Sequence, residues 1–469
     1  MKMVERNPGT VAGWITDHDG KIRGAFTQDK LYNEVWYRDS EEDEWQTVAR
    51  FHYDDPKGIQ PMGFAYDNKT WYVQSFQDKD TAGIYKYDPT SGELGELIFR
   101  HDEYDAGGLI WSDKQEKILG ATYFTSKPHW VGLDEEFTAM MTGLENAFPD
   151  KVVNIVSLDD EEDTLVVSTS SDTDPGGFYL FDRSEGKLEP LVERMPWIDP
   201  ADMTEMRPIS YTSRDGLTIH GYLTTPKGSD GEDLPLIVNP HGGPWARDFW
   251  GFNPEHQFFA SRGYAVLQMN FRGSTGYGRK HLTASYKQWG RNMQNDITDG
   301  VKWAIEEGIA DPERVCIYGG SYGGYATMAG MVFTPELYKC GVNYVGVTDI
   351  ALLFKTMPDR WNLGAAQMKD RVGDPETEEE FLAEISPVNH VENIRAPVFI
   401  VHGRKDPRVS IRHADILRDE MEEHGKPYEW MVKNDEGHGF AKQENRIELY
   451  TAMAEFFDKH IGSGASTGP

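Results

Sequence analysis

Residues 319–325 constrain the fold of this chain more than any other segment. They read Gly-Gly-Ser-Tyr-Gly-Gly-Tyr, after the β-branched run 314–318 and before the helix-favouring run 326–331. A strand and a helix can be joined by so sharp a turn only when small residues let them pack closely. The turn places the hydroxyl of Ser321 at a helix N-terminus, where backbone N–H groups favour developing negative charge. The segment therefore predicts an exposed, nucleophilic serine at the end of a buried strand.

A nucleophilic serine needs a histidine as base and a carboxylate that orients the histidine. In α/β-hydrolases the acid and then the histidine follow the serine along the chain. Asp406 comes just after the apolar run 397–401, and His438 lies between two glycines after the run 428–432. Because the carboxyl ends of parallel strands meet at one sheet edge, we expect Ser321, Asp406 and His438 to form a catalytic triad. The alternative for Asp406 is a helix cap for the run that begins near residue 410.

The loop 240–244, Pro-His-Gly-Gly-Pro, follows the apolar run 236–239. Glycines there let the main chain approach the oxyanion that forms during acyl transfer, as in lipases and esterases. We expect the backbone N–H groups of Tyr322 and Gly243 to form the oxyanion hole, with Gly242 as the alternative second donor. A plain tight turn is the other interpretation of this loop.

The second half of the chain alternates strand-like and helix-like segments. This pattern predicts a mostly parallel sheet covered by helices on both faces, the α/β-hydrolase fold, over residues 209–461. Residues 196–208, rich in Pro, Asp and Met, are predicted to be a linker. The Gly/Ser/Thr-rich tail, 462–469, is predicted to be flexible.

Residues 1–195 contain short strand-like segments separated by polar turns and carry an internal repeat. Residues 83–94 match residues 177–188, and a fainter copy spans 35–40. Repeats of this length are typical of β-propeller blades, so we predict an incomplete propeller of about four blade units. A β-sandwich is the alternative. Residues 134–148 interrupt the pattern with helical spacing of apolar residues.

Taken together, the motifs in the second half resemble those of the prolyl oligopeptidase family of serine peptidases. The similarity is to its acylaminoacyl-peptidase and dipeptidyl-peptidase-like members. The resemblance implies a propeller that limits substrates to peptides, and a role for Arg408 in holding a substrate carbonyl; a surface arginine is the alternative. The motifs are residues 241–244, 270–278, 319–325, 402–406 and 436–440.

The chain departs from the family pattern in two respects. Family propellers have seven or eight blades, and only about four fit here. Either a second subunit covers the open strand edges, giving a homo-oligomer, or the open fan admits bulkier substrates. The dipeptidyl branch grips a free amine with paired glutamates, and none of the Glu-Glu pairs at 41–42, 135–136 and 161–162 is assigned that role.

These patterns predict a serine hydrolase that cleaves short or N-acylated peptides through an acyl-enzyme. A carboxylesterase acting on small acyl esters is the alternative, and a propeller-based binding protein without activity is a third interpretation. Neither a cofactor nor a metal is implied. Candidate substrate contacts are Arg408, Gly242, Tyr325, Trp361 and Trp245, although core packing is an alternative for the three aromatic residues.

The net charge argues against some classes of binding partner, and the cysteine content and the N-terminal residues bear on the cellular compartment. A net charge of −31 argues against nucleic acid and anionic membranes, because binding phosphate needs Lys and Arg. Cys316 and Cys340 are predicted to be small buried hydrophobic residues, since two cysteines make no disulfide framework. Residues 1–14 contain no apolar leader segment, so we expect a cytoplasmic enzyme.

Overall fold

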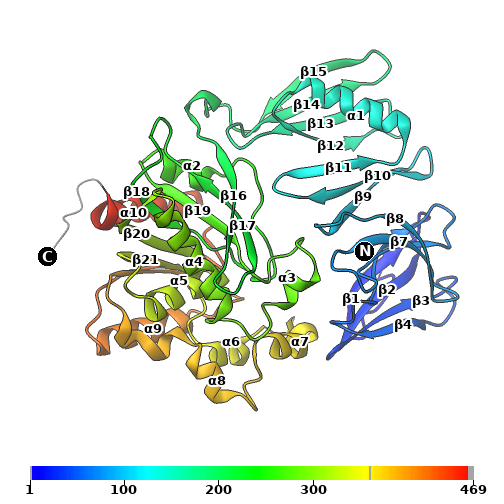
Figure 1. The fold of residues 1–469 in the computed structure, drawn as a ribbon. Coiled ribbons are helices and arrows are strands. Elements are labelled where there is room, and N and C mark those ends of the chain that lie inside the picture. Colours follow the sequence, from blue (N-terminus) through cyan, green and yellow to red (C-terminus); the bar gives the residue numbers. More distant parts are fainter. Residues whose placement is uncertain (1–2, 359–360, 463–469) are drawn as a thin grey trace.

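The computed structural model describes residues 3–358 and 361–462, and Figure 1 shows two parts side by side. The N-terminal part consists of successive antiparallel sheets, and the C-terminal part is one large sheet flanked by helices. None of the helices in the described ranges is long and apolar enough to cross a membrane.

The N-terminal part contains four antiparallel sheets, which correspond to the four predicted blade units. The first, second and fourth sheets along the chain have four strands each, and the third sheet has three. The first two sheets are formed by β1 (Val11–Thr16), β2 (Ile22–Asp29), β3 (Tyr32–Tyr37), β4 (Gln46–His52), β5 (Gln60–Phe64), β6 (Trp71–Ser75), β7 (Gly83–Asp88) and β8 (Glu93–Phe99). The others are formed by β9 (Ala106–Ser112), β10 (Lys117–Phe124), β11 (Pro128–Gly132), β12 (Val152–Leu158), β13 (Thr164–Ser170), β14 (Gly177–Asp182) and β15 (Lys187–Glu193).

The internal repeat marks equivalent strands of different sheets. Its copies fall on β3, β7 and β14, each the third strand of a four-stranded unit. The third unit carries no copy, and there α1 (Glu135–Ala147) follows β11 in place of a fourth strand. Asp134 caps α1 by accepting a hydrogen bond from Phe137 N at 2.9 Å. The predicted helical segment is therefore present and interrupts the repeat.

The C-terminal part is built on an eight-stranded sheet in the order β16-β17-β19-β18-β20-β21-β22-β23. The pairs from β19 through β23 are parallel, whereas β16 and β17 join the sheet in antiparallel fashion. This is the α/β-hydrolase fold. Its strands are β16 (Met206–Thr212), β17 (Thr218–Thr224), β18 (Leu234–Val238), β19 (Ala265–Asn270), β20 (Ala310–Gly320), β21 (Cys340–Tyr344), β22 (Val398–Gly403) and β23 (Tyr428–Lys433).

Two hydrophobic cores lie on opposite faces of this sheet, because successive strand residues alternate between them. Val315 and Ile317 pack into one core, and Cys316 and Tyr318 of the same strand pack into the other. The first core includes α4 (Asn292–Glu306), α5 (Tyr322–Phe333) and α9 (Arg412–Glu423); the second includes α2 (Pro254–Ala260) and α10 (Gln443–Ile461).

Some elements were not predicted from the sequence. Strand β16 begins at Met206, inside the segment 196–208 predicted as a linker, which also contains the 3₁₀ helix η1 (Pro200–Asp202). The tail 463–469 lies outside the described residues. Further helices that the periodicity did not indicate are α2, α3 (Arg279–Thr283), α6 (Ile350–Thr356), α7 (Asn362–Val372), α8 (Glu379–Glu384) and η3 (Pro387–Asn393).

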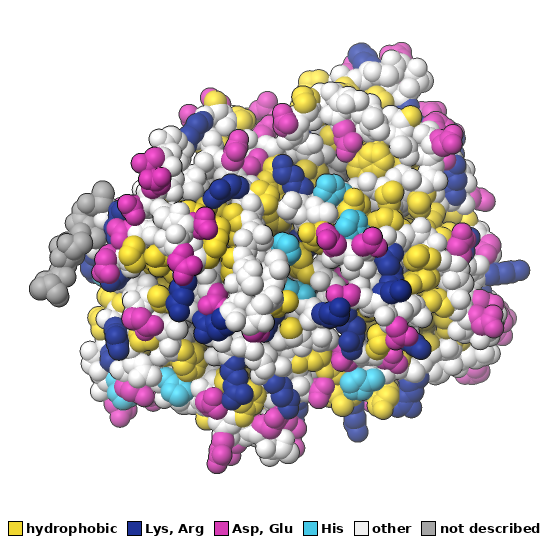
Figure 2. Space-filling view, viewed as in Figure 1, with side chains coloured by type: hydrophobic (Ala, Val, Ile, Leu, Met, Phe, Trp, Pro, Cys, Tyr) yellow, Lys and Arg dark blue, Asp and Glu magenta, His cyan; other side chains and the backbone are white. Residues whose placement is uncertain are grey.

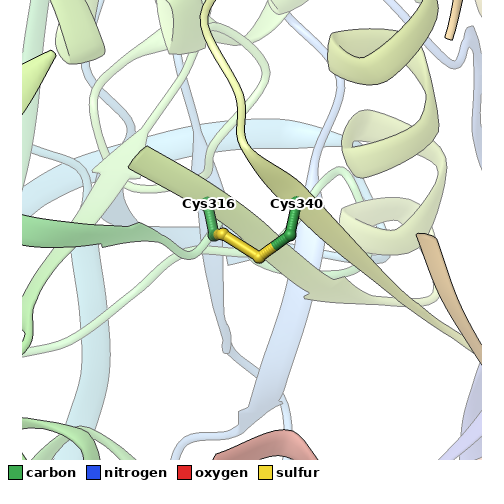
Figure 3. Close-up of a disulfide and its surroundings, with 2 residues drawn as sticks. All are labelled: Cys316 and Cys340. Atoms are coloured by element: carbon green, nitrogen blue, oxygen red, sulfur yellow. A yellow bond between two sulfur atoms is a disulfide. The ribbon is translucent and has the colours of Figure 1, made fainter. Parts of the chain in front are cut away.

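The two cysteines form a disulfide that the sequence did not lead us to expect (Figure 3). Both are fully buried, as predicted, but they are not free. They occupy directly paired positions on the adjacent parallel strands β20 and β21. The prediction failed because it treated the cysteines only as side chains in apolar runs, without the strand order that makes the two runs neighbours.

The two parts meet through loops of the N-terminal sheets. Asp54 forms an ion pair with Arg279 at 3.1 Å. Asp80 accepts a hydrogen bond from Lys280 N at 2.8 Å, and Asp105 accepts one from Gly278 N at 3.3 Å. Acidic, basic and histidine side chains lie along this seam in Figure 2. Three acidic loops from the first part thus contact one short segment of the second.

Candidate active site

Ser321 occupies the turn between β20 and α5 and has φ 60° and ψ −117°. Residues other than glycine rarely adopt such a backbone conformation, and those that do cluster at functional sites. The neighbouring glycines are needed because a Cβ on Gly319 would lie 2.5 Å from the Gly323 carbonyl, and one on Gly323 would lie 2.2 Å from the Pro240 oxygen. The predicted strand–turn–helix is therefore present, with Ser321 at the N-terminus of a buried helix.

Asp406 and His438 follow the neighbouring strands β22 and β23 at the same edge of the sheet. His438 Nδ1 lies 2.7 Å from Asp406 Oδ2. The other carboxylate oxygen of Asp406 accepts hydrogen bonds from the N–H groups of Arg408 at 2.8 Å and Val409 at 2.9 Å. The structure thus joins the predicted acid and base. The N–H bonds of Asp406 lie in the turn before α9, whose N-cap is Ile411, so Asp406 is not the helix cap held as its alternative.

The environment of Asp406 favours its charged form. Burial alone would raise the pKa of Asp406, but hydrogen bonds from His438 and from backbone N–H groups outweigh burial, so the pKa lies below its usual range. A carboxylate that stays ionised fixes the proton of neutral His438 on Nδ1, which leaves Nε2 free to accept a proton.

Tyr344, the last residue of β21, connects the loops of Ser321 and His438. Its carbonyl accepts a hydrogen bond from Ser321 N at 3.0 Å, and its hydroxyl accepts one from Phe440 N. Within the described residues, no hydrogen bond joins Ser321 Oγ to His438. Catalytic contacts of this kind often tighten only when substrate is bound.

Glu436 holds the loop that carries His438. Its carboxylate accepts hydrogen bonds from the N–H groups of Ala441 at 2.9 Å and Lys442 at 3.0 Å, and from Asn445 Nδ2 at 2.7 Å. Burial works to raise the pKa of Glu436, but these hydrogen bonds prevail and lower it. Lys405 N donates to the Glu436 carbonyl at 2.9 Å, which ties the loop of His438 to the loop of Asp406.

The loop 240–244 lies beside the serine. A Cβ on Gly242 would be 3.1 Å from the Gly320 oxygen and 3.5 Å from Ser321 Cβ, so the loop passes close to the serine and a side chain there would be tightly packed. Gly243 has φ +124°, in the region that favours glycine. Tyr322 is the first residue of α5, so its N–H belongs to the unpaired first turn. The loop that carries the proposed donor Gly243 and the first turn of α5, which carries the proposed donor Tyr322, therefore both adjoin the predicted nucleophile.

The candidate substrate contacts differ in their surroundings. Arg408 is exposed, directly after Asp406 and Pro407. Trp245 is partly buried and donates through Nε1 to Ser285 Oγ at 3.3 Å, and Trp361 is partly buried just before α7. Tyr325 is fully buried and donates to the Ile385 carbonyl at 2.8 Å, which is the core role that the sequence left open for it.

Two supporting residues were not predicted from the sequence motifs. Tyr344 has no motif of its own, because its role depends on β21 lying between β20 and β22. Glu436 lies within the motif 436–440, and an acidic residue next to a Gly-His-Gly turn is a usable signal for a loop anchor. Each Glu-Glu pair left unassigned has a member with a local partner: Glu41 with Lys21, Glu136 with Arg183 and Glu162 with Ser112.

Comparison with known proteins matches this site to a family. The model of the prolyl oligopeptidase family matches residues 250–464. The chain is 33% identical to dipeptidyl aminopeptidase BIII of Pseudoxanthomonas mexicana, over 97% of this chain and 67% of that protein. It is 30% identical to dipeptidyl peptidase family member 6 of Caenorhabditis elegans, over 95% of this chain and 65% of that protein. The chain thus spans about two thirds of the length of these relatives.

Solved structures share the fold at lower sequence identity. A puromycin-hydrolyzing peptidase of Mycobacterium tuberculosis superposes with a TM-score of 0.81 at 21% identity, over 98% of this chain and 71% of the other. An acylaminoacyl peptidase of Pyrococcus horikoshii gives a TM-score of 0.71 at 21% identity, over 95% and 70%. With the nucleophile turn, the acid–base pair and the relatives that match nearly its whole length, the chain belongs to the prolyl oligopeptidase family of serine peptidases.

Proposed function

We propose that this chain cleaves short peptides or N-acylated peptides through an acyl-enzyme formed on Ser321. His438 accepts the proton of Ser321 as the hydroxyl attacks the carbonyl, and Asp406 stabilises the imidazolium that results. The N–H groups of Tyr322 and Gly243 stabilise the oxyanion. His438 then protonates the leaving amine, and water hydrolyses the ester.

The observation that carries this proposal is the Asp406–His438 hydrogen bond of 2.7 Å at the sheet edge where β20 presents Ser321. The relatives that match nearly the whole chain are named as dipeptidyl peptidases, and a relative named acylamino-acid-releasing enzyme matches 51% of the chain. The shared chemistry of both names is cleavage close to a peptide N-terminus. Arg408, exposed beside the triad, is proposed to hold a substrate carbonyl because a guanidinium offers several donors.

A comparison of three substrates tests this function. A free dipeptidyl anilide, an acyl-amino-acid anilide and a short nitrophenyl ester are offered to the wild type and to Ser321→Ala. We expect cleavage of at least one anilide by the wild type and none by Ser321→Ala, whose fold is checked by circular dichroism. Ester turnover without anilide cleavage would replace the peptidase with a carboxylesterase, and unchanged activity in Ser321→Ala would remove the serine mechanism.

A further inference from the structure

His241, which the proposed mechanism does not use, is bonded on both sides of its ring next to the oxyanion loop. Its Nδ1 lies 2.7 Å from the Gly242 carbonyl oxygen, and its Nε2 lies 2.9 Å from Ser274 Oγ. The ring stacks on Phe271 with centroids 4.3 Å apart and an interplanar angle of 15°. The imidazole is thus held in one orientation by three neighbours.

The hydrogen-bond partners of His241 determine which of its two ring nitrogens carries the proton. A carbonyl only accepts, so the contact with the Gly242 oxygen requires a proton on Nδ1. Burial lowers the pKa of His241 to about 4, so the ring is neutral near pH 7 and Nε2 carries no proton. Nε2 therefore faces Ser274 Oγ as an acceptor.

The hydroxyl of Ser274 lies between two acceptors, the Phe271 carbonyl and His241 Nε2. Ser274 Oγ donates to the Phe271 carbonyl at 2.7 Å, and that oxygen also accepts from Ser274 N at 3.0 Å and from His281 Nε2 at 3.1 Å. The one hydroxyl proton of Ser274 is therefore shared between the Phe271 oxygen at 2.7 Å and His241 Nε2 at 2.9 Å.

The orientation of His241 affects the proposed oxyanion donor, Gly243 N–H, through the peptide group that joins Gly242 to Gly243. In a planar trans peptide the C=O and the N–H point in opposite directions. Fixing the Gly242 carbonyl toward His241 therefore fixes the N–H of Gly243 on the other side of the same group. Because a Cβ on Gly242 would lie 3.5 Å from Ser321 Cβ, this peptide adjoins the nucleophile.

We propose that His241 is a positioning residue that aims the Gly243 N–H at the oxyanion through the hydrogen bond of its Nδ1 to the Gly242 carbonyl, and that Ser274 holds the other side of the ring. This inference rests on the proposed function, since it specifies how one oxyanion donor is held in place. It differs from a packing role because it depends on which nitrogen of the ring carries the proton.

Two substitutions of His241 separate the two nitrogens. The amide of His241→Asn can place its NH₂ near the position of Nδ1 and still donate to Gly242, whereas His241→Gln reaches only toward the position of Nε2. We expect kcat to fall by about 10- to 100-fold in His241→Gln, less than the full loss of an oxyanion donor, with KM nearly unchanged. His241→Asn should keep most of the activity, and Ser274→Ala should lie between them.

Binding of a transition-state analogue gives the second measurement. A peptidyl trifluoromethyl ketone forms a tetrahedral adduct with the serine, so its inhibition constant should rise in proportion to the loss of kcat/KM across the three variants. The affinity of a product peptide should stay constant. Equal kcat in the Asn and Gln variants, a loss confined to KM, or weakening of both ligands alike would overturn the positioning role.

The tautomer is tested independently of activity by nitrogen-15 NMR of the histidine side chains. We expect a protonated Nδ1 and an unprotonated Nε2 for His241 between pH 6 and 8, and the same tautomer in Ser274→Ala, because the Gly242 carbonyl requires the Nδ1 proton. A proton on Nε2 in the wild type would refute the assignment. If the wild type cleaves none of the substrates, the proposed function fails, while the NMR result still decides the tautomer.

Discussion

At the scale of single residues, sequence motifs located the candidate site because they combine special backbone geometry with particular chemistry. The glycines around Ser321 are required by contacts of 2.2–2.5 Å that a Cβ would make, so the motif records a packing constraint. Asp406 and His438 could be selected by chain order and strand ends. The roles of His241 and Tyr344 could not, because Ser274 and Phe440, with which they form hydrogen bonds, come from distant segments.

The charged state of Asp406 leads to a prediction for Asp406→Asn. An amide NH₂ facing His438 would favour a proton on Nε2, which could then no longer accept the proton of Ser321. We expect kcat to fall by about 10⁴-fold with little change in KM, as for the same change in a known triad. Steady-state kinetics on the best anilide measures this. Asp415→Asn, on α9 beside Arg418, is the matched control and should leave kcat unchanged.

The same variant should also change how stability depends on pH. The pKa of Asp406 is lower in the folded state than in the unfolded chain, so its contribution is present above the unfolded value of about 3.9 and is lost as pH falls through the folded value. Urea titrations should therefore show the unfolding free energies of wild type and Asp406→Asn converging below about pH 4. A gap that widens on acidification would contradict this sign.

At the scale of elements, the long amphipathic helices and buried strands could be predicted, whereas short helices could not. α4, α5, α9 and α10 have lengths and periods that signal a helix, but α3 and α8 span 5 and 6 residues. Such short helices are decided by tertiary contacts. Asp80, for example, caps α3 from the other part of the molecule.

The two classes of glycine seen in the helices predict opposite effects for one substitution. Gly143 lies exposed within α1, and a Cβ there would meet nothing within 4 Å, so Gly143→Ala should stabilise the protein by about 0.5–1 kcal/mol. In α5, the Cβ of Gly323→Ala would meet the Pro240 oxygen at 2.2 Å, so we expect a loss of about 1–3 kcal/mol and of activity. Chemical unfolding of both variants compares them, and effects of equal sign would contradict the steric argument.

At the scale of the whole molecule, the sequence predicted two kinds of architecture but not how they dock. The repeat indicated blade units, yet nothing in it marked Asp54, Asp80 and Asp105 as the residues that contact the segment 276–280. Docking contacts depend on complementary surfaces of separate segments, which no periodicity records. The expectation that a second subunit covers open strand edges stays a prediction.

The docking contacts imply that the N-terminal part supports the catalytic part. Asp80→Ala removes a side-chain cap from α3, a change that typically costs about 0.5–2 kcal/mol. We expect faster amide hydrogen exchange in residues 279–284 and a lower kcat, because Ser274 lies on the same connection. Asp78→Ala, which removes only an exposed ion pair with Lys57, should change neither. Unaltered exchange in Asp80→Ala would show that the contact does not order this segment.

The bond between residues 316 and 340 means that one gene can yield two chemically distinct products. Cells that keep thiols reduced would produce the protein with two free thiols, whereas oxidising surroundings would produce the disulfide-bonded protein. Both sulfur atoms are buried in the core, so oxidants and reductants would reach them chiefly when the protein unfolds locally. Samples from different expression hosts would therefore keep their different redox states through purification. The melting temperature of a sample would then depend on the redox conditions of its production as well as on its sequence.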